Sequence, residues 1–259
     1  MDFSLMTAFG IAFIFFMTTA GAALSFCFQK EMSERIQTAI FGFASGVMFA
    51  AAIWSLLLPA LAESEKTWNG HAFVPVTIGF LLGGVLIEIL DHFFNEKYGK
   101  DENETAWARA KKLFISVTIH NIPEGLSVGF AFGAAYVTGS FTSCVAALGL
   151  AIGVGIQNFP EGAAVALPIR LASGNKRKGF LYGAFSGVVE PIFAIIGFYF
   201  ATVLQVLQAW LLAFSAGTMV FVVLDALLPE MQRKDGKSGG AWWVMIGFTL
   251  MMILDVAFA

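Results

Sequence analysis

Charge is what this sequence has least of. Asp, Glu, Lys and Arg make up 13% of its 259 residues, about half the share found in soluble domains. Hydrophobic residues make up 58%, the mean hydropathy is +0.78, and the charges cluster between apolar runs of about 18 residues or more, the length that crosses a bilayer. The alternating segments of about ten residues that build a membrane β-barrel are missing. The composition therefore excludes a soluble domain and predicts an all-α polytopic membrane protein.

Cysteine and histidine are also scarce, as are basic residues at the start of the chain. The two cysteines, Cys27 and Cys144, stand apart in apolar runs, so we expect neither a disulfide nor a thiolate metal site. Met1 and Asp2 provide no basic region, so the first apolar run is expected to stay as an anchor, with a cleaved signal peptide as the alternative. The longest connection, about 95–111, contains no histidine. It therefore does not support a His-rich metal sensor, and its mixed charges predict a flexible loop.

Eight apolar stretches divide the chain into membrane spans within a single transmembrane domain, residues 1–259. Fourteen of the 15 Lys and Arg residues lie in the connections after the first, third, fifth and seventh spans. Because such residues stay on the cytoplasmic side, both termini are expected on the extracytoplasmic side. The turn near 137–139 is short, so spans four and five are expected to form an antiparallel hairpin. The predicted spans are about 4–28, 36–61, 73–94, 112–136, 140–170, 179–203, 208–230 and 241–258.

An internal repeat relates spans two and three to spans seven and eight. Because five spans separate the members, the two halves must be inverted relative to the membrane. We therefore predict an inverted repeat of spans 1–3 and 6–8 around the central 4–5 hairpin, an architecture that in transporters places the substrate site near the midplane. The matching segments are Phe43–Met48 with Phe214–Met219, Leu57–Pro59 with Leu227–Pro229, Ile78–Phe80 with Ile246–Phe248, and Ile89–Asp91 with Ile253–Asp255.

Two near-identical motifs lie inside spans four and five. His120–Gly125 reads His-Asn-Ile-Pro-Glu-Gly, and Gln157–Gly162 reads Gln-Asn-Phe-Pro-Glu-Gly. On a helix the first, second and fifth positions share one face, so each motif turns a metal-capable cluster in one direction. The Pro and Gly that flank each glutamate are expected to loosen the backbone there. Apolar packing alone does not require these polar groups twice.

The depth of the two motifs decides whether they can meet. Counted from a turn at 138, His120 and Gln157 lie about 27–29 Å from that surface, level within about one residue. The two glutamates then point in opposite directions, roughly 13 Å apart along the axis, which is too far for one ion between ideal helices. A later start of the second helix, or kinks at Pro123 and Pro160, would bring the groups together. The sequence leaves both corrections open.

Ionised carboxylates inside a membrane are unfavourable unless they are paired or bind a metal. Only His120 could be a cationic partner within the motifs. A divalent cation resolves the cost, because imidazole and carboxylate both suit zinc, iron, manganese or cadmium. Glu190, followed by Pro191, is a third intramembrane carboxylate and is expected to join the site, so that two adjacent ions could be held. The alternative is an isolated protonated Glu190 against a backbone carbonyl.

The paired motifs resemble those of the ZIP (Zrt-/Irt-like) metal transporters, specifically the GufA-type branch, and the resemblance covers essentially all eight spans, including Trp54–Leu57. It implies import of divalent cations into the cytoplasm, zinc first, with Cd²⁺, Fe²⁺ and Mn²⁺ as further candidates, one or two ions per site. It suggests a homodimer, and we expect it in the cell (inner) membrane. Many ZIP proteins have His in place of Gln157 and some relatives have Asp in place of Asn158, so metal choice and binuclear occupancy stay open. The implied metal-site residues are His120, Asn121, Glu124, Gln157, Asn158, Glu161, Glu190, which would complete a second metal position, and Met48, which would lend a thioether to the first.

Several polar residues and one methionine have two interpretations each. Met48 could pack rather than bind metal, and Ser55 could hydrate the entrance or bond its own helix backbone. Acidic and histidine residues near the span ends could attract and relay cations or form solvated clusters. At the cytoplasmic end these are Glu88, Asp91, His92 and Glu230, and on the outer loop they are Glu63, Glu65 and His71.

Two other classes of function compete with transport. An intramembrane metal-dependent enzyme is the main alternative, but the sequence contains no His-Glu-x-x-His motif and no separate general base beside an open metal position. A non-transporting sensor or scaffold would need a regulatory soluble domain, and none is predicted. We therefore expect a transporter and not an enzyme, with metal ions and lipid as partners and no nucleic acid.

Overall fold

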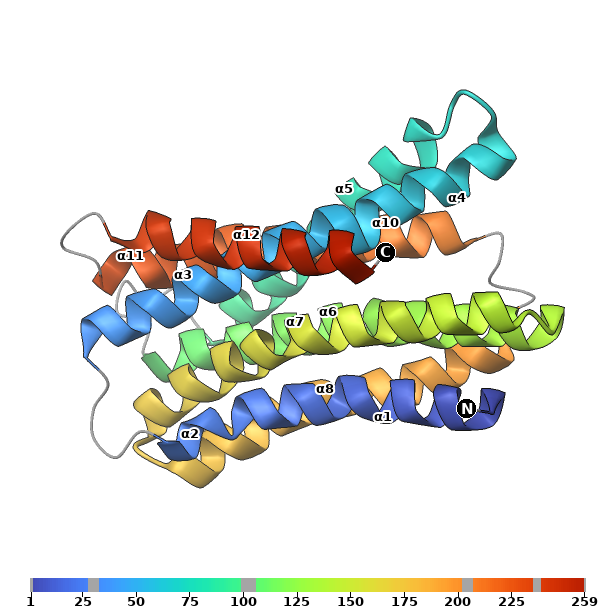
Figure 1. Cartoon of the computed structure of the whole chain (residues 1–259). Helices are drawn as coiled ribbons and strands as arrows, with labels where there is room; N and C mark the ends of the chain where they lie inside the picture. Colours follow the sequence, from blue (N-terminus) through green and yellow to red (C-terminus); the bar gives the residue numbers. More distant parts are fainter. Residues whose placement is uncertain (1, 28–32, 99–105, 202–206, 235–238, 259) are drawn as a thin grey trace.

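The computed structural model describes residues 2–27, 33–98, 106–201, 207–234 and 239–258, and every regular element in those ranges is helical (Figure 1). The all-α prediction is confirmed. The elements are α1 (Phe3–Ala22), α2 (Leu24–Cys27), α3 (Glu34–Ala51), the π-helical η1 (Ala52–Leu57), α4 (Leu58–Trp68), α5 (Phe73–Tyr98), α6 (Ala106–Thr138), α7 (Phe141–Ser173), α8 (Lys176–Tyr199), α10 (Gln208–Val222), the π-helical η3 (Val223–Leu227), α11 (Leu228–Lys234) and α12 (Gly240–Phe258).

Seven helical stretches among the described residues are long and apolar enough to cross a membrane. They correspond to all the predicted spans except the fourth, which is α6. This helix has 33 residues, about 50 Å of length, but His120, Asn121 and Glu124 lower the hydropathy of its middle. Because α6 packs along α7 and α8, which both qualify, we count it as the eighth span.

The connection expected at about 95–111 is shorter than predicted. Residues 95–98 continue α5 and residues 106–111 begin α6, while 99–105 lie outside the described residues. The Lys, Glu and Arg side chains at these helix ends favour helix as much as loop, which is why mixed charge alone was a poor guide to the boundaries.

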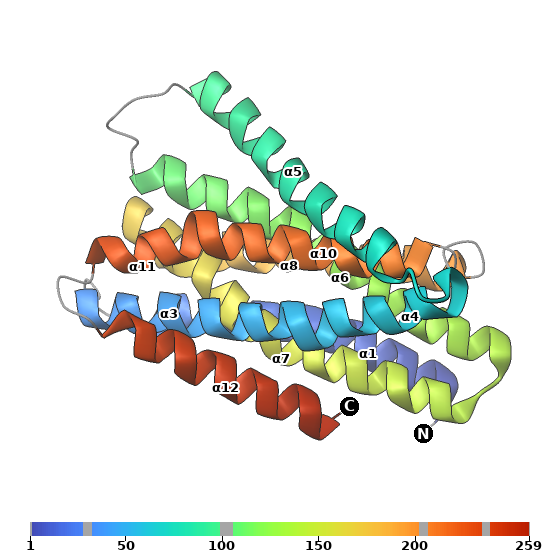
Figure 2. The same cartoon turned by 90° about the horizontal axis from the view of Figure 1, so that it is seen from above.

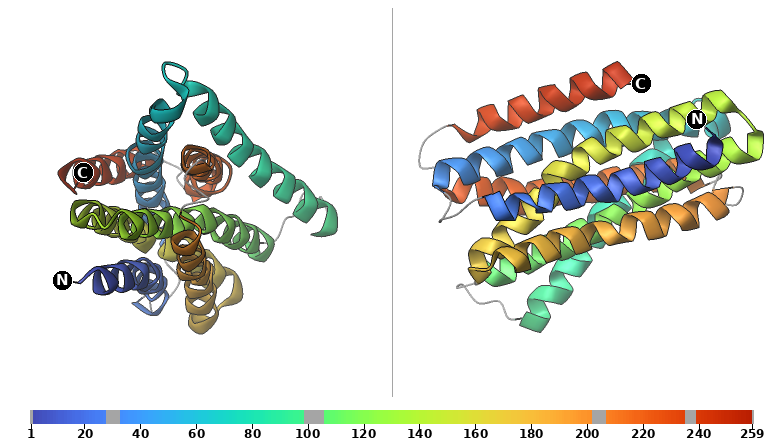
Figure 3. Two further views of the ribbon diagram at one scale, coloured as in Figure 1. Left: turned by 90° about the vertical axis from the view of Figure 1, so that its right-hand side faces the viewer. Right: turned by 60° about the horizontal axis from the view of Figure 1, so that its bottom comes forward.

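The helices form two bundles. The first bundle comprises α1, α6, α7 and α8, and the second comprises α3, α5, α10 and α12 (Figure 3). Within the first bundle α1 packs against α7, and α8 packs against α6 in the equivalent way. Within the second, α12 packs against α3 as α5 packs against α10. These are the pairs that an inverted repeat around the α6–α7 hairpin must produce, so the predicted repeat is confirmed.

The register of the repeat differs from the predicted one in one place. Gly247 of α12 faces the backbone of Phe43, and Gly83 of α5 faces the backbone of Phe214. A Cβ on Gly247 would overlap the backbone of Phe43, and a Cβ on Gly83 would overlap the backbone of Phe214. The two glycines therefore occupy equivalent positions of close helix approach in the two halves. The sequence match of the Ile-Gly-Phe triplets instead paired Gly247 with Gly79, which lies one helical turn earlier. A slip of one turn keeps the same helix face, so the triplet match was wrong without disturbing the pattern.

Both repeat halves also contain a π-helical segment at matching positions. η1 interrupts the second span just before Pro59, and η3 interrupts the seventh span just before Pro229. Proline cannot donate to the carbonyl one turn earlier and crowds it, and the wider π-helical turn relieves that clash. Segments of this kind often accompany functional sites in helices.

The two ends of the molecule carry different connections. The ends of α2, α7 and α11 lie at one end, at the left in Figure 1, while the start of α1 and the α6–α7 turn lie at the other. α5 leans away from the other helices and contacts mainly α10 (Figure 2). Its outer face exposes Leu81, Leu82, Val85 and Ile89, as expected for a face that meets lipid.

Candidate metal centre

The two motifs meet in the middle of the α6–α7 hairpin, where their His, Asn, Gln and Glu side chains are completely buried. His120 Nε2 lies 3.2 and 3.3 Å from the two carboxylate oxygens of Glu161 and 3.7 Å from Glu124 Oε1. Gln157 donates a hydrogen bond from Nε2 to Glu124 Oε1. The imidazole or amide at the start of each motif therefore faces the carboxylate of the other motif.

The pairing corrects the predicted depth of the motifs. His120 is level with Glu161, and Glu124 is level with Gln157, whereas His120 was expected opposite Gln157. The reason is the turn: α6 continues to Thr138 and α7 begins only at Phe141, so the second helix is shifted by about one turn. Of the two corrections that the sequence left open, the late start of the second helix is the one observed, and the prolines lie inside helices that continue through them.

Glu190 of α8 contacts both motifs through their asparagines, and its role as a metal ligand stays a prediction. Its Oε2 accepts a hydrogen bond from Asn158 Nδ2 at 2.7 Å. Its Oε1 accepts from Asn121 Nδ2 at 3.1 Å and from Thr18 Oγ1 at 2.7 Å. Asn121 Nδ2 also lies 3.0 Å from the carbonyl of Ser186. Glu190 is thus not isolated against a backbone carbonyl, which was the alternative.

Thr18 is the contact that sequence reasoning missed. It lies in α1 within an apolar run, and its side chain is fully buried. Its only sequence signal is the pair of hydroxyls at Thr18 and Thr19 in an otherwise apolar stretch. Such residues usually bond to their own helix, as Thr118 does with the carbonyl of Phe114, so the signal is weak.

The glycines of the two motifs bring neighbouring helices close rather than loosening the backbone. Both helices continue through their motifs. A Cβ on Gly125 would overlap the backbone of Glu190, and a Cβ on Gly162 would overlap the backbone of Thr18. In the inverted repeat Thr18 of α1 is therefore the counterpart of Glu190 of α8, and the two counterparts touch each other.

The centre contains more buried acceptor atoms than the described residues can satisfy. His120, Glu124 and Glu161 offer ligand atoms that all lie within 4.8 Å of one another. Two ligands of a tetrahedral zinc ion lie about 3.3 Å apart, close to the separation of His120 Nε2 from Glu161. Four oxygens of the centre are buried without a hydrogen-bond partner among the described residues: Asn121 Oδ1, Glu124 Oε2, Gln157 Oε1 and Asn158 Oδ1. These are acceptors that a cation satisfies. His120 Nδ1 also has no partner among them, and whether it donates or accepts depends on the tautomer.

Two further residues lie outside this set of contacts. Met48 is completely buried and belongs to the apolar cluster that includes Ala164 and Val165 of α7, so its thioether role stays a prediction. The Oγ of Ser55 donates a hydrogen bond to Asp255 Oδ1 at 2.7 Å and so links η1 to α12. This contact is neither a bond to its own helix backbone nor a bond to solvent.

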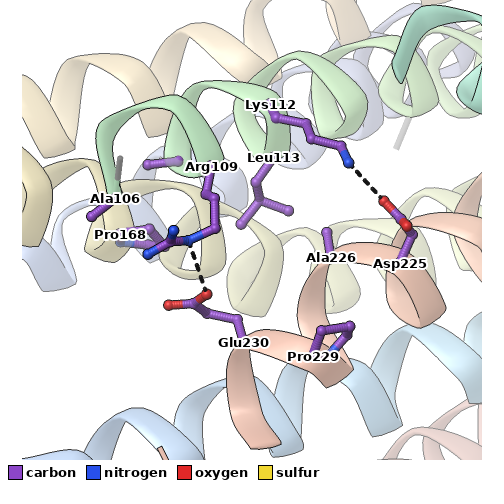
Figure 4. Close-up of a pocket in the computed structure, with 10 residues that line it drawn as sticks. Ala106, Arg109, Lys112, Leu113, Pro168, Asp225, Ala226, Pro229 and Glu230 are labelled. Atoms are coloured by element: carbon purple, nitrogen blue, oxygen red, sulfur yellow. Dashed lines mark ion pairs between the residues drawn. The ribbon is translucent and has the colours of Figure 1, made fainter. Parts of the chain in front are cut away.

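A cavity of about 260 Å³ lies at the end of the hairpin helices remote from the α6–α7 turn (Figure 4). Two ion pairs cross it from α6 to the seventh span. Arg109 Nε lies 3.8 Å from Glu230 Oε2, and Lys112 Nζ lies 3.1 Å from Asp225 Oδ2. Glu230 is therefore neither free nor simply solvated. The cavity is also lined by Leu113 of α6.

The remaining acidic and histidine candidates whose side chains the structure describes lie away from the centre. Glu88 and His92 are exposed on α5, and the side chain of Asp91 is outside the described residues. On the opposite side, Glu63 pairs with Lys66, and Glu65 accepts a bond from the backbone of Gly70. His71 is exposed. The structure brings none of the candidates with described side chains to the buried centre.

Comparisons with known proteins agree on one family. The family model described as "ZIP Zinc transporter" matches residues 108–255. The chain is 34% identical to the human zinc transporter ZIP11, over 95% of each chain. It is 29% identical to the zinc transporter GufA of Myxococcus xanthus, over 92% of this chain and 94% of the relative. It is 34% identical to the zinc transporter ZIPB of Bordetella bronchiseptica, over 93% of this chain and 78% of the relative.

Proposed function

This chain belongs to the ZIP family of zinc transporters, and from that premise we propose that it imports zinc through the buried centre shared by α6 and α7. The family consists of transporters, so the chain is a transporter of divalent metal cations, and the intramembrane-enzyme hypothesis is not supported. Cadmium, iron and manganese are further candidate cargoes, because the same imidazole and carboxylate ligands suit them.

The observation that carries the site assignment is the set of buried acceptors without partners. We assign the cargo position to His120, Glu124 and Glu161, whose ligand atoms are already gathered within 4.8 Å. The free amide oxygen of Gln157 can complete a fourfold shell. Two glutamates supply the two negative charges that neutralise a divalent ion, which removes the cost of burying them. The thioether of Met48 remains the expected fifth contributor.

The contacts of Glu190, the second candidate metal position, favour a resting state in which the chain holds one ion and not two. Both oxygens of Glu190 already accept hydrogen bonds, three in all, from Asn121, Asn158 and Thr18. In contrast, Glu124 retains an unpartnered oxygen. A second ion would have to displace these donors, so we propose one ion per chain as the usual stoichiometry and two as the limit.

The release side is the end that carries the cavity of Figure 4. Basic residues keep to the cytoplasmic side, and α6 begins there with Arg109, Lys111 and Lys112. This orientation puts both termini outside the cytoplasm, as the charge distribution predicts. Leu113, in the cavity wall, and Val117, one turn further along α6, are both buried and form an apolar seal between the cavity and the centre.

The two bundles suggest how the site changes its access. Every motif side chain, Glu190 and Thr18 belong to the first bundle, while the seventh span with Asp225 and Glu230 belongs with the second. Movement of the first bundle past the second would open the seal and leave the ligands of α6 and α7 together, while Met48 of α3 would move relative to them; such movement of one bundle against another is typical of inverted-repeat transporters. We propose that residues 1–259 act as one such multi-pass unit in the cell (inner) membrane, and that the homodimer expected from the resemblance forms through its lipid-side faces.

Zinc flux into liposomes tests the assignment. Purified protein is reconstituted and Zn²⁺ or Cd²⁺ entry is followed for the wild type and for Glu124→Ala/Glu161→Ala. We expect flux in the wild type and none above protein-free liposomes in the double variant, because the cation then loses both charged ligands. Glu65→Ala/Glu88→Ala removes two exposed carboxylates outside the centre and is the matched control. Flux that survives in the first double variant would remove the centre from the transport path.

A further inference from the structure

We propose that Thr18 is a positioning residue for cation binding, acting through Glu190 on the amides of Asn121 and Asn158. The inference rests on the proposed transport site and adds a residue that neither motif contains. Thr18 touches no atom of the His120, Glu124 and Glu161 cluster in the described contacts, so its effect on the cation has to pass through Glu190.

The contact geometry makes Glu190 a hub. Thr18 Oγ1 lies 2.7 Å from Glu190 Oε1, while the carbonyl of Ile14, its own-helix alternative, is 3.2 Å away. The hydroxyl has one proton, and the shorter, charge-assisted contact is the stronger one. The other two donors to Glu190 are the amide groups of Asn121 and Asn158. Every hydrogen bond that Glu190 accepts thus comes from a neutral side chain.

Fixing the donor end of an amide fixes its oxygen. Asn121 and Asn158 both donate a hydrogen bond from Nδ2 to Glu190, so their Oδ1 atoms point away from Glu190. These two oxygens are buried without a partner among the described residues. Asn121 follows His120 directly, and Asn158 follows Gln157 directly. Asn158 Oδ1 therefore keeps its direction only while Glu190 keeps its orientation. Asn121 Nδ2 donates to the carbonyl of Ser186 as well as to Glu190, so its amide is held from two sides.

The backbone packing holds Thr18 in place for this role. Gly162 accommodates the carbonyl of Thr18, and Gly187 accommodates its side chain. Thr18 is thus clamped between α7 and α8, the helices that carry Asn158 and Glu190. A hydroxyl held this way restricts the carboxylate without contributing charge, which leaves the two negative charges at Glu124 and Glu161 for the cation.

The test compares Thr18→Val, Thr18→Ser and Thr19→Val in liposomes, with the initial Zn²⁺ uptake rate measured against concentration. Removing the hydroxyl in Thr18→Val should raise KM about tenfold, the lower end of the effect of a hydrogen bond to a charged group, with a smaller change in the maximal rate. Thr18→Ser keeps the hydroxyl and should restore a KM close to that of the wild type. Thr19→Val removes a neighbouring hydroxyl that has no partner among the described residues and should match the wild type.

A spectroscopic readout separates positioning from general damage. Co²⁺ bound to detergent-purified Thr18→Val should show an altered visible spectrum relative to the wild type, since the oxygens around the ion change, whereas Thr18→Ser should not. If Thr18→Val does not purify as a folded protein, Thr18→Ala removes the hydroxyl without the branched methyl groups.

Two outcomes overturn the proposal. One is a wild-type KM and Co²⁺ spectrum in Thr18→Val, and the other is a Thr18→Ser variant as impaired as Thr18→Val. Either result leaves the transport site intact, because wild-type flux and its loss in Glu124→Ala/Glu161→Ala are measured separately.

Discussion

At the scale of single residues, the neutral Asn158 keeps Glu190 as the only carboxylate that the structure describes at its own side of the buried centre. Its Nδ2 donates to Glu190 Oε2 at 2.7 Å. An aspartate there would bring two carboxylates to that distance, which is strongly unfavourable unless a cation lies between them. We therefore expect Asn158→Asp to bind about two divalent ions per chain where the wild type binds about one, measured as metal per protein after equilibration with Zn²⁺ or Cd²⁺.

The control for this substitution is Asn175→Asp. Asn175 is the exposed N-cap of α8 and accepts hydrogen bonds from the backbone of Arg177 and Lys178, a role that aspartate performs equally well. The control should bind as many ions as the wild type. Equal stoichiometry in Asn158→Asp and the wild type would mean that a proton, not a metal, separates the two carboxylates.

The sequence indicated those residues of the centre whose polar side chains have no structural explanation in an apolar run. His120, Glu124 and Glu161 were expected together and lie together. Glu190 was expected to join them, but its printed contacts are with Asn121, Asn158 and Thr18, and its role as a metal ligand stays a prediction. Thr18 was not predictable, because a threonine satisfies itself against its own helix at almost no cost. Only the tertiary approach of α1 to α8 gives its hydroxyl a carboxylate partner.

At the scale of the helices, the motif glycines determine how closely the first bundle packs. A Cβ on Gly125 would overlap the backbone of Glu190 on α8, and backbone cannot yield as a flexible side chain does. We expect Gly125→Ala to destabilise the protein by about 1–3 kcal/mol and to lower its melting temperature in detergent. Because the helices must separate at Glu190, Zn²⁺ uptake should fall as well.

Gly153→Ala is the matched control on α7. The nearest atom to a Cβ at Gly153 is 3.8 Å away, on Asp255, which is an ordinary contact. Alanine favours helix over glycine by about 1 kcal/mol, so this variant should melt at the wild-type temperature or above it. A Gly125→Ala variant that melts with the control would show that the α6–α8 approach is not tight.

The sequence correctly predicted a hairpin of spans four and five, but it placed the two helices in the wrong register. Spans four and five were expected to be antiparallel and are, but the turn lies between Thr138 and Phe141 instead of at 138. A displacement of two residues in a turn changes the pairing across a hairpin by four, about one helical turn. That was sufficient to exchange the partner of His120 from Gln157 to Glu161, since sequence marks turns less precisely than helices.

At the scale of the whole molecule, the ion pair between Lys112 and Asp225 links the two bundles at the cavity of Figure 4. Their side chains are 24% and 40% exposed, so the pair contributes about 1 kcal/mol at most. A contribution of that size suits a contact that must break in each transport cycle. It is still sufficient to shift a balance between closed and open forms severalfold.

Charge exchange at this pair tests the link between the bundles. Asp225→Lys places two cations together and should favour separation, whereas Lys112→Asp/Asp225→Lys restores attraction with the signs reversed. The readout is labelling of Leu113→Cys, a buried position that lines the cavity, by a maleimide in a Cys27→Ser background, because Cys27 is exposed. We expect severalfold faster labelling in the single variant and near-original labelling in the exchanged pair. Glu63→Gln breaks an ion pair within α4 and should leave the rate unchanged; an exchanged pair that labels as fast as Asp225→Lys would mean that the two charges do not hold the bundles together.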